Sequence, residues 1–199
     1  MKILGLTGSV GMGKSTAAAM LRRLGVPVHD ADAAVHRLMA RGGAAVTAVE
    51  AAFPGTLRDG AIDRKALGGQ VFGDPAALRR LEALLHPRVR AETEAWLRRQ
   101  RRRRVSLVVL DVPLLFESGD LRRYDAVIVV SAPPFVQRAR VLRRPGMTEA
   151  RFQQVLAQQL PDREKRRRAQ FVVSTGLSKG HTLRQLARIV RLYRNGSRD

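Results

Sequence analysis

Residues 2–16, KILGLTGSVGMGKST, decide the fold of this chain of 199 residues. The run from Ile3 to Thr7 is short, apolar and ended by glycine, which is typical of a buried strand in a parallel sheet. Lys14 to Leu24 has apolar residues at helical spacing, and Gly25 supplies a C-terminal stop. The glycine-rich segment between strand and helix therefore lies at the carboxyl end of a strand, where open α/β sheets bind ligands.

The segment from Gly8 to Ser15 has the Gly-x-x-x-x-Gly-Lys-Ser spacing of a phosphate-binding loop. Glycines let consecutive backbone N–H groups turn inward and approach phosphate oxygens closely. The helix that follows directs the positive end of its dipole at the same anion. We expect Lys14 to reach the β- and γ-phosphates and the Ser15 hydroxyl to ligate Mg²⁺. The nucleotide-binding residues predicted from this segment are Gly8, Ser9, Val10, Gly11, Met12, Gly13, Lys14, Ser15 and Thr16.

Strands alternate with helices along the rest of the chain, which predicts an α/β protein with a three-layer parallel sheet. The stretch between the second and third strands is mostly helical, contributes no clear strand and is interpreted as an inserted lobe. Within it, a helix over Ala76 to Gln100 is predicted to break at His86-Pro87, because proline removes a backbone donor. The five expected strands are 3–7, 26–28, 105–110, 126–130 and 171–173, and the other expected helices include 30–39, 135–143, 148–160 and 183–193.

The net charge of +20 is the unusual feature of the composition. It is compatible with nucleic-acid binding or with an enzyme for anionic small molecules. Arginine outnumbers lysine by 32 to 5, which indicates a compositional bias. The longest basic run, Arg98 to Arg104, closes a predicted helix, where cations are favourable, and we expect it to be solvated.

The chain has no cysteine, which excludes disulfides and thiolate chemistry. No apolar run approaches the roughly 18 residues that a membrane span needs. Lys2 leads directly into the first strand, so no secretory signal is read at the N-terminus. The sequence therefore predicts a cytoplasmic protein that does not act at a membrane.

Asp30 and Asp32 follow the second predicted strand, in Val28-His29-Asp30-Ala31-Asp32. A carboxylate at a strand end can orient or deprotonate an attacking hydroxyl in the ligand crevice. Aspartate is also favoured as a helix N-cap. For Asp30 both interpretations stay open, whereas for Asp32 we favour the functional one.

Taken together with further motifs, these residues resemble the dephospho-CoA kinase family. The segments that carry the resemblance are GSVGMGKST at 8–16, HDADAAVH at 29–36, LLHP at 84–87 and DVPLLFESG at 111–119. Residues 137–144, 146–159 and 169–176 continue it in order, so it covers nearly the whole chain. Many families share the phosphate loop, but the other motifs in this order are much more specific.

The resemblance implies P-loop kinase topology with a helical insert and a small helical lid. It also implies transfer of the ATP γ-phosphoryl group to the ribose 3′-hydroxyl of dephospho-CoA, the last step of coenzyme A synthesis. ATP and Mg²⁺ are the implied cofactors. Residues 1–31, 105–139 and 166–199 would form the nucleotide-binding core, 32–104 the insert that binds dephospho-CoA, and 140–165 the lid.

Catalytic and metal-binding roles follow from the resemblance residue by residue. Asp32 falls at the position of the catalytic base, and Lys14 and Arg140 are its implied catalytic partners. Asp111 stands where a carboxylate holds the Mg²⁺ shell, together with Ser15.

Binding roles follow in the same way. Arg144 lies with Arg140 in the lid segment, where arginines close over the phosphates. His86 and Arg88 are the implied dephospho-CoA-binding residues, although His86-Pro87 could equally be a structural break.

Two positions depart from the family pattern. Gln170 replaces an acidic residue, and Thr175, which is assigned to the nucleotide, replaces an asparagine near the adenine. These departures put side-chain contacts to adenine in question and leave the phosphate chemistry untouched. Among nearby residues, Glu117 is expected to be structural, and Gln158 and Gln159 to lie on a solvated or lid-contacting face.

Two other functions remain open from the sequence. The first is another P-loop small-molecule or nucleotide kinase, and the second is an ATP-dependent nucleic-acid-binding protein, which the charge motivates. The motifs favour small-molecule partners, ATP and dephospho-CoA, with no nucleic acid required. The sequence does not indicate an oligomeric state.

Overall fold

The computed structural model describes residues 1–195 except 118 and 120, so residues 196–199 of the predicted core lie outside the described residues. The chain divides into two compact units. Unit 1 consists of Met1–His29 and Arg101–Asp199, and unit 2 is Asp30–Gln100. By sequence, unit 1 has 26 basic and 8 acidic residues, whereas unit 2 has 11 and 9. Nearly all of the positive charge therefore belongs to unit 1.

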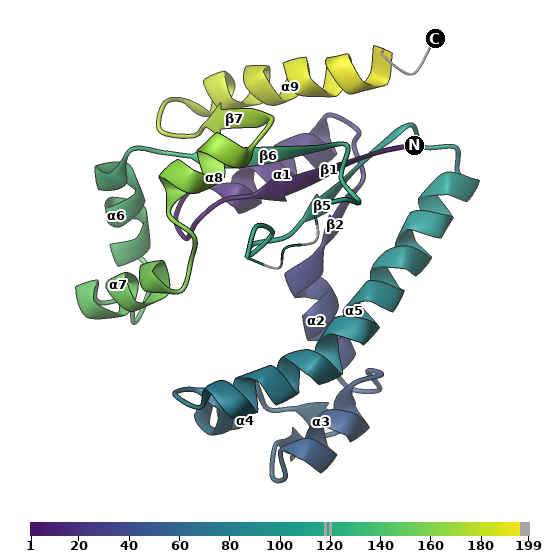
Figure 1. The fold of residues 1–199 in the computed structure, drawn as a ribbon, viewed down its shortest axis with the longest axis vertical. Helices are drawn as coiled ribbons and strands as arrows, with labels where there is room; N and C mark the ends of the chain where they lie inside the picture. Colours follow the sequence, from purple (N-terminus) through teal and green to yellow (C-terminus); the bar gives the residue numbers. More distant parts are fainter. Residues whose placement is uncertain (118, 120, 196–199) are drawn as a thin grey trace. The chain divides into compact units, whose positions relative to one another are not determined.

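A five-stranded sheet with the order β2-β5-β1-β6-β7 forms the framework of unit 1 (Figure 1). β1 pairs in parallel with β5 and β6, and β6 pairs in parallel with β7. Every residue of β5 and β6 is buried, as their continuous β-branched and aliphatic runs predict. The predicted α/β fold with a parallel sheet is confirmed. The strands are β1 (Lys2–Thr7), β2 (Val28–Asp30), β5 (Leu107–Asp111), β6 (Ala126–Ser131) and β7 (Phe171–Ser174).

The second strand begins later than predicted, at Val28 instead of Val26. Pro27 lies between the two positions and has no N–H to donate to a neighbouring strand. Its carbonyl still accepts the N–H of Val109 at 3.0 Å. The chain therefore joins the sheet edge at Pro27 but forms a regular strand only after it.

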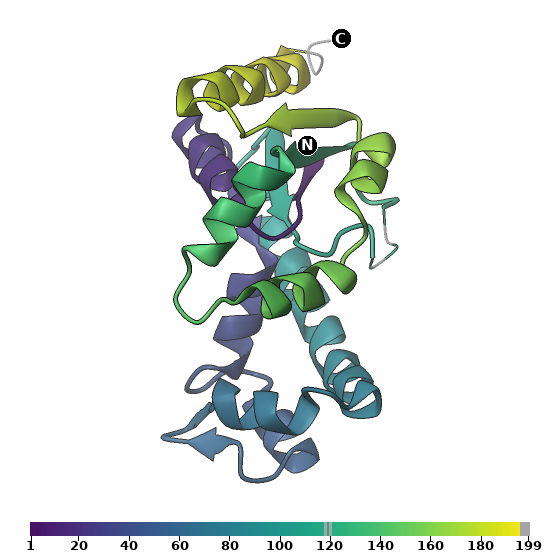
Figure 2. The same cartoon turned by 90° about the vertical axis from the view of Figure 1, so that its left-hand side faces the viewer.

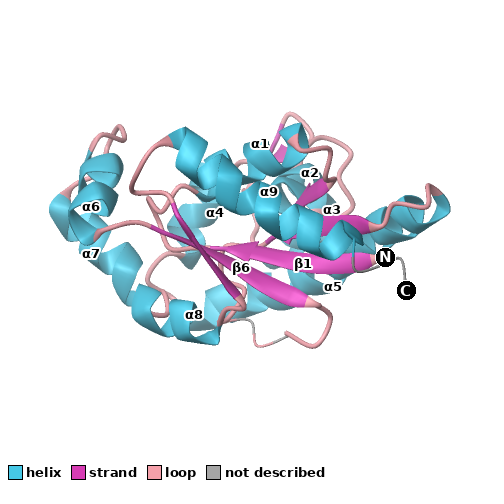
Figure 3. Cartoon of the chain, turned by 90° about the horizontal axis from the view of Figure 1, so that it is seen from above, coloured by secondary structure: helices cyan, strands magenta, loops and turns pink. Residues whose placement is uncertain are grey.

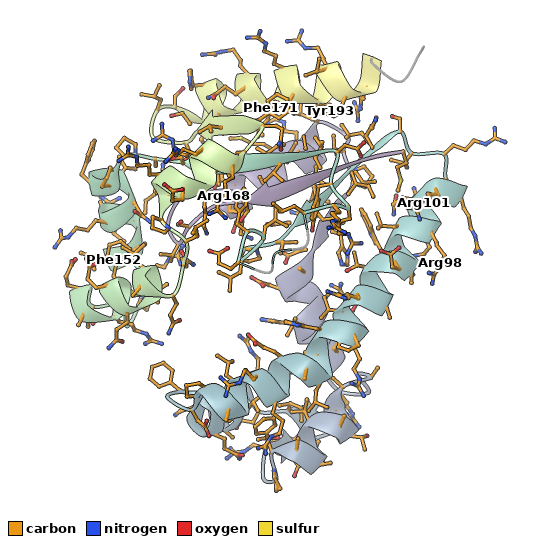
Figure 4. The ribbon with its side chains drawn as sticks, in the orientation of Figure 1. Arg98, Arg101, Phe152, Arg168, Phe171 and Tyr193 are labelled. Atoms are coloured by element: carbon orange, nitrogen blue, oxygen red, sulfur yellow. The ribbon has the colours of Figure 1, made fainter. Side chains whose placement is uncertain are left out.

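Helices cover both faces of this sheet (Figure 3). α1 (Lys14–Arg23) and α9 (Lys179–Asn195) lie on one face, and α8 (Asp162–Arg168) lies on the other. Phe171 and Tyr193 fix α9 to β7 through an edge-to-face contact, with ring centroids 6.0 Å apart (Figure 4). This core of two helical layers and a sheet holds the phosphate loop at the end of β1.

Two further helices of unit 1, α6 (Pro134–Leu142) and α7 (Glu149–Ala157), pack against each other (Figures 1 and 2). Thr148 caps α7 by accepting the N–H of Arg151, and Phe152 is the buried side chain of this helix (Figure 4). The helix predicted over 148–160 is confirmed but ends three residues earlier, at Ala157, and α8, which starts after Pro161, was not predicted. α8 was missed because six of its seven residues are not buried.

Unit 2 contains α2 (Ala31–Met39), α3 (Val46–Ala52), α4 (Arg64–Val71) and most of α5 (Pro75–Arg102). Its helices enclose a separate apolar core, in which Phe53 is nearly fully buried. Arg80 stacks on the Phe53 ring from α5, with 4.6 Å between the guanidinium carbon and the ring centroid. The other buried members of this core are Leu38, Met39, Ala45, Val49, Ile62, Leu67, Ala77, Leu81 and Leu85.

A small hairpin in unit 2 contradicts the prediction that the insert contributes no strand. β3 (Leu57–Arg58) pairs antiparallel with β4 (Ala61–Ile62). Asp59 and Gly60 join the two strands, with φ values of 49° and 78°. An Asp-Gly pair with two positive φ angles is the strongest short-range hairpin signal, so the sequence contained the evidence for this turn.

The long helix α5 does not break at His86-Pro87, contrary to prediction. It is continuous from Pro75 to Arg102 with Pro87 inside, and its axis changes direction along its length (Figure 1). Arg88 donates to the carbonyl of Leu84 at 2.7 Å and to that of Ala44 at 3.2 Å. Proline bends a helix because it has no N–H to donate, here to the carbonyl of Ala83 four residues earlier. The Arg88 side chain donates to the next carbonyl, that of Leu84.

The basic run that closes α5 is solvated, as expected. Arg98, Arg99 and the four arginines 101–104 are exposed, and Figure 4 labels Arg98 and Arg101 along this part of the helix. Arg104 has a φ of 54°, so the chain leaves the helix through a left-handed residue before β5.

Candidate active site

The phosphate loop connects β1 to α1 in unit 1. Gly13 is the N-cap of α1 with φ 85°, and it provides no side-chain cap. The first turn of α1 contains no acidic residue. The helix dipole and the first N–H groups of α1 are therefore directed at a site where an anion is favoured.

Two glycines of the loop are also required by packing. A Cβ atom at Gly8 would lie 2.5 Å from Cγ2 of Val130, and one at Gly11 would lie 2.5 Å from Cγ2 of Val141. Real Cβ atoms do not approach other atoms this closely. The loop therefore lies directly against β6 and α6, which limits the shapes it can adopt.

Lys14 and Asp111 form an ion pair beside the loop. The Nζ atom of Lys14 lies 2.6 Å from Oδ1 of Asp111, and the Asp111 side chain is only 3% exposed. The parallel register places Asp111 opposite Leu6, close to the end of β1. The structure thus brings together a predicted phosphate ligand and a predicted metal ligand.

Ser15 and Thr16 are exposed at the start of α1. Within the described part of the chain, no three His, Cys, Asp or Glu side chains are grouped to hold a metal ion. Mg²⁺ in phosphate-transfer sites needs no such group, because one or two protein ligands combine with water and phosphate oxygens. Ser15 and Asp111, the two residues predicted to hold Mg²⁺, both carry side-chain oxygen atoms.

Arg140 and Thr175 are linked to each other and to the phosphate loop. Arg140 on α6 donates to the carbonyl of Thr175 at 2.6 Å and to its hydroxyl at 3.1 Å. The Thr175 hydroxyl donates to the carbonyl of Met12 at 2.7 Å. The buried Thr175 side chain thus supports the loop, and its assignment to the nucleotide stays a prediction. Arg144, in contrast, is exposed beyond the end of α6.

Other residues of the loop are fixed by groups that sequence reasoning missed. The buried sulfur of Met12 accepts the N–H of Ala132 at 3.1 Å, and the Met12 N–H donates to the carbonyl of Ser9. Val10 hydrogen-bonds to two glutamine side chains, Gln137 and Gln159. Of the two glutamines expected on a solvated or lid-contacting face, Gln159 contacts the loop and Gln158 is exposed.

Gln170, the other departure from the family pattern, has a role within the sheet. Its side-chain carbonyl accepts the N–H of Val127 at 2.8 Å. The neighbouring pair in the β6–β7 ladder is Ile128 and Phe171. Gln170 therefore continues the ladder by one hydrogen bond, which accounts for a polar side chain at this position.

The two acids after β2 have different roles. Asp30 is the N-cap of α2, and its carboxylate accepts the N–H of Ala33 at 3.0 Å. Asp32 lies in the first turn of the same helix and is exposed. The structural interpretation of Asp30 is thereby favoured, and Asp32 is the acid left accessible to a substrate.

The predicted substrate-binding residues His86 and Arg88 also belong to unit 2. His86 is exposed on α5, next to Pro87. Arg88 is partly buried, and its guanidinium donates to the two backbone carbonyls already described. Of these two residues, His86 is the more accessible to a ligand.

Glu117 connects the segment after β5 to α8. Its carboxylate lies 2.9 Å from the Nζ atom of Lys165, a fully buried side chain, and accepts the N–H of Leu160 at 2.8 Å. Burial raises the pKa of Glu117, but the hydrogen bonds from Lys165 and Leu160 outweigh burial and bring the pKa below its ordinary value. The contacts support the predicted structural role of Glu117.

Replacing Lys165 with methionine should lower thermal stability more at pH 7 than near pH 4. With its pKa lowered, the Glu117 carboxylate contributes stability that is present above the unfolded pKa of about 4.3. That stability is lost as the pH falls through the folded pKa. Thermal melts of the wild-type and Lys165→Met proteins at pH 4, 5 and 7 measure the difference. A difference that does not change with pH would show that Lys165 acts through packing alone.

Solved structures with this arrangement of sheet and phosphate loop give the class of the protein. The structure of TT1252 from Thermus thermophilus matches with a TM-score of 0.85 and 37% identity, covering 96% of each chain. Dephospho-CoA kinase from Campylobacter jejuni matches with a TM-score of 0.74 and 25% identity, covering 99% of this chain and 100% of the other. Together with the loop itself, these matches define a P-loop kinase.

The family follows from sequence comparison. The dephospho-CoA kinase family model matches residues 2–179. Dephospho-CoA kinase of Paramagnetospirillum magneticum is 70% identical over 166 residues, which are 83% of this chain and 78% of the relative. The chain belongs to the dephospho-CoA kinase family. The function predicted from the sequence, that of a kinase acting on dephospho-CoA in coenzyme A biosynthesis, is confirmed.

Crossing a bilayer requires a helix that is both long and strongly apolar. Among the described residues, each helix lacks that combination of length and apolar character.

Proposed function

We propose that this chain transfers the γ-phosphoryl group of ATP to the ribose 3′-hydroxyl of dephospho-CoA, with the phosphate loop holding ATP and Asp32 acting as base. The observation that carries the proposal is the N-terminus of α1, which has a glycine cap and no acidic residue in its first turn. Lys14 adds a positive charge at the same place. This combination binds a polyphosphate through backbone N–H groups and one ammonium group.

The loop from Gly8 to Thr16 holds the triphosphate in this proposal, and Lys14 acts on its outer phosphates. The N–H groups of Val10 and Met12 are donated to Gln159 and Ser9, so these two residues shape the loop and other N–H groups contact the phosphates. Phosphoryl transfer needs positioning and charge stabilisation more than covalent help from the protein. The ammonium group of Lys14 supplies positive charge, and its ion pair with Asp111 already holds this group near the loop. Less reorganisation is then needed when charge develops on the transferring group.

Ser15 and Asp111 are the residues that would hold Mg²⁺. A hydroxyl and a carboxylate oxygen suit this hard cation, which prefers oxygen ligands. Bound Mg²⁺ would neutralise charge on the β- and γ-phosphates. Asp111 is positioned for this role by the end of β5.

Asp32 is proposed to accept the proton of the 3′-hydroxyl. The hydroxyl oxygen then bonds to the γ-phosphorus, the bond from this phosphorus to the β–γ bridging oxygen breaks, and its electron pair leaves with ADP. The exposure of Asp32 and the capping role of Asp30 support this assignment. We assign His86 and Arg88 to binding dephospho-CoA, and His86 is the more exposed of the two.

Residues 32–104 are proposed as the acceptor-binding segment and 140–165 as the lid, with the remaining residues forming the nucleotide-binding core. Arg140 and Arg144 belong to the lid end in this assignment. The exposed guanidinium of Arg144 is available to phosphates, whereas Arg140 is held at Thr175. We therefore expect Arg140 to act through the loop as well as on the phosphates.

The proposed reaction gives a use to the basic residues of unit 1. Unit 1, which contains the phosphate loop, has an excess of 18 basic residues, and unit 2 has an excess of 2. A positive field around the loop attracts ATP and offsets its repulsion from a second anion. ATP is a cytoplasmic metabolite, and we propose that the enzyme acts in that compartment.

An acceptor panel tests the proposal. ADP release from ATP and Mg²⁺ should depend on dephospho-CoA and should be absent with adenosine, AMP or shikimate as acceptor. Phosphorus NMR of the product should show a new phosphate monoester at the ribose 3′ position. Release with another acceptor, or a phosphate at a different hydroxyl, would contradict the proposed function.

A further inference from the structure

Both backbone polar groups of Val10 in the phosphate loop are held by glutamine side chains. The Val10 N–H donates to Oε1 of Gln159 at 3.1 Å, and the Val10 carbonyl accepts from Nε2 of Gln137 at 2.8 Å. These partners are 149 and 127 residues away in the chain. Val10 lies in the turn between β1 and α1, outside regular secondary structure, so it depends on such partners.

Gln137 is fixed within α6. Its side chain belongs to a residue that is only 7% exposed, and its own N–H donates to the carbonyl of Pro133. The carbonyl of Gln137 lies 3.1 Å from the position of a Cβ at Gly11. The backbone of α6 therefore lies against the loop, and Gln137 holds one side of it from a rigid helix.

Gln159 reaches the loop from the connection between α7 and α8. The next residue, Leu160, donates its N–H to Glu117 at 2.8 Å, and Glu117 pairs with the buried Lys165. The backbone at Gln159 is thus fixed to the segment after β5, while its side chain extends to Val10. Through Gln159, the end of α7 is connected directly to the phosphate loop.

We propose that Gln159 is a positioning residue that keeps the phosphate loop in its ATP-binding shape, with Gln137 holding the opposite side. The loop binds phosphate only when its N–H groups converge on one point. Without side-chain partners for Val10, the turn would sample other conformations. Small displacements of binding groups reduce catalysis strongly. The inference rests on the proposed function insofar as ATP is the nucleotide bound.

Gln159→Ala, with Gln158→Ala as the matched control, tests the proposal. Gln158 is the exposed neighbour and C-cap of α7. For Gln159→Ala we expect an increase of about 10-fold in the Kd and KM for ATP, and a KM for dephospho-CoA within about twofold of wild type. Gln158→Ala should stay within about twofold of wild type in every constant.

Gln159→Glu is the rescue variant, because a carboxylate oxygen still accepts the N–H of Val10. It should recover most of the ATP affinity that Gln159→Ala loses. Gln137→Glu makes the same chemical change on the other side of Val10 but removes the donor to its carbonyl. We expect Gln137→Glu to bind ATP more weakly than Gln159→Glu, with melting temperatures recorded for all variants.

ATP binding by calorimetry separates this inference from the proposed reaction, since it requires no acceptor. If the wild-type protein bound ATP but did not phosphorylate dephospho-CoA, the proposed reaction would be wrong. The role of Gln159 would still be decided by comparing ATP binding in the variants. Wild-type ATP affinity in Gln159→Ala, or equal losses in Gln159→Ala and Gln158→Ala, would overturn the role of Gln159.

Discussion

Replacing Lys14 with methionine should reduce kcat by about 10²–10³-fold, the usual effect of removing one group that stabilises charge in a transition state. Methionine keeps the unbranched shape of the side chain and removes only the ammonium group. The KM for dephospho-CoA should change little, because Lys14 lies at the phosphate loop of unit 1. Steady-state kinetics with each substrate varied in turn measures both effects.

The same variant should also lose stability, because Asp111 is buried and its ammonium partner is removed. We expect a loss of about 1–3 kcal/mol in the free energy of unfolding, the usual cost for a buried acceptor that loses a partner. Adding Asp111→Asn should recover part of that stability without recovering turnover. Near-wild-type kcat in Lys14→Met would rule out the assigned role of the loop.

Replacing Asp32 with asparagine should lower kcat by about 10²–10⁴-fold while ATP still binds, which is the range for loss of a general base. Asparagine retains the size and polarity of the side chain but cannot accept the proton of the acceptor hydroxyl. Because Asp32 is exposed in the first turn of α2, the melting temperature should change little. Calorimetric ATP binding and steady-state kinetics test the two parts of this expectation.

Asp30→Asn is the matched control for Asp32→Asn. Asparagine is as good an N-cap as aspartate, so α2 should stay intact and activity should remain close to wild type. If Asp30→Asn were the inactive variant and Asp32→Asn the active one, the base would be Asp30 and our assignment would be wrong.

The sequence predicted those features that depend on neighbouring residues. The glycines at 8, 11 and 13, followed by Lys14, specify the phosphate loop because their conformations and close contacts are local requirements. The strands at β5 and β6 were predicted because buried parallel strands are continuous apolar runs. The Asp-Gly hairpin at 59–60 belongs to the same class of local signals but was overlooked.

Contacts between distant segments could not be predicted. The hydroxyl of Thr175 reaches Met12 across 163 residues, and no local pattern distinguishes this use from an adenine contact. The partners of Val10 are equally remote. α8 was missed because it has no apolar side chain at helical spacing to bury. Its one buried side chain is Lys165, and the partner of Lys165, Glu117, lies far away in the sequence.

Pro87 and Arg88 are free to change independently during evolution. The N–H that Pro87 lacks would donate to the carbonyl of Ala83, four residues earlier, whereas the Arg88 side chain donates to the carbonyls of Leu84 and Ala44. A lineage that lost the proline would gain a backbone donor for Ala83, and Arg88 would keep both of its contacts. A lineage that lost the arginine would release Ala44 from α5, whether or not the proline was still present.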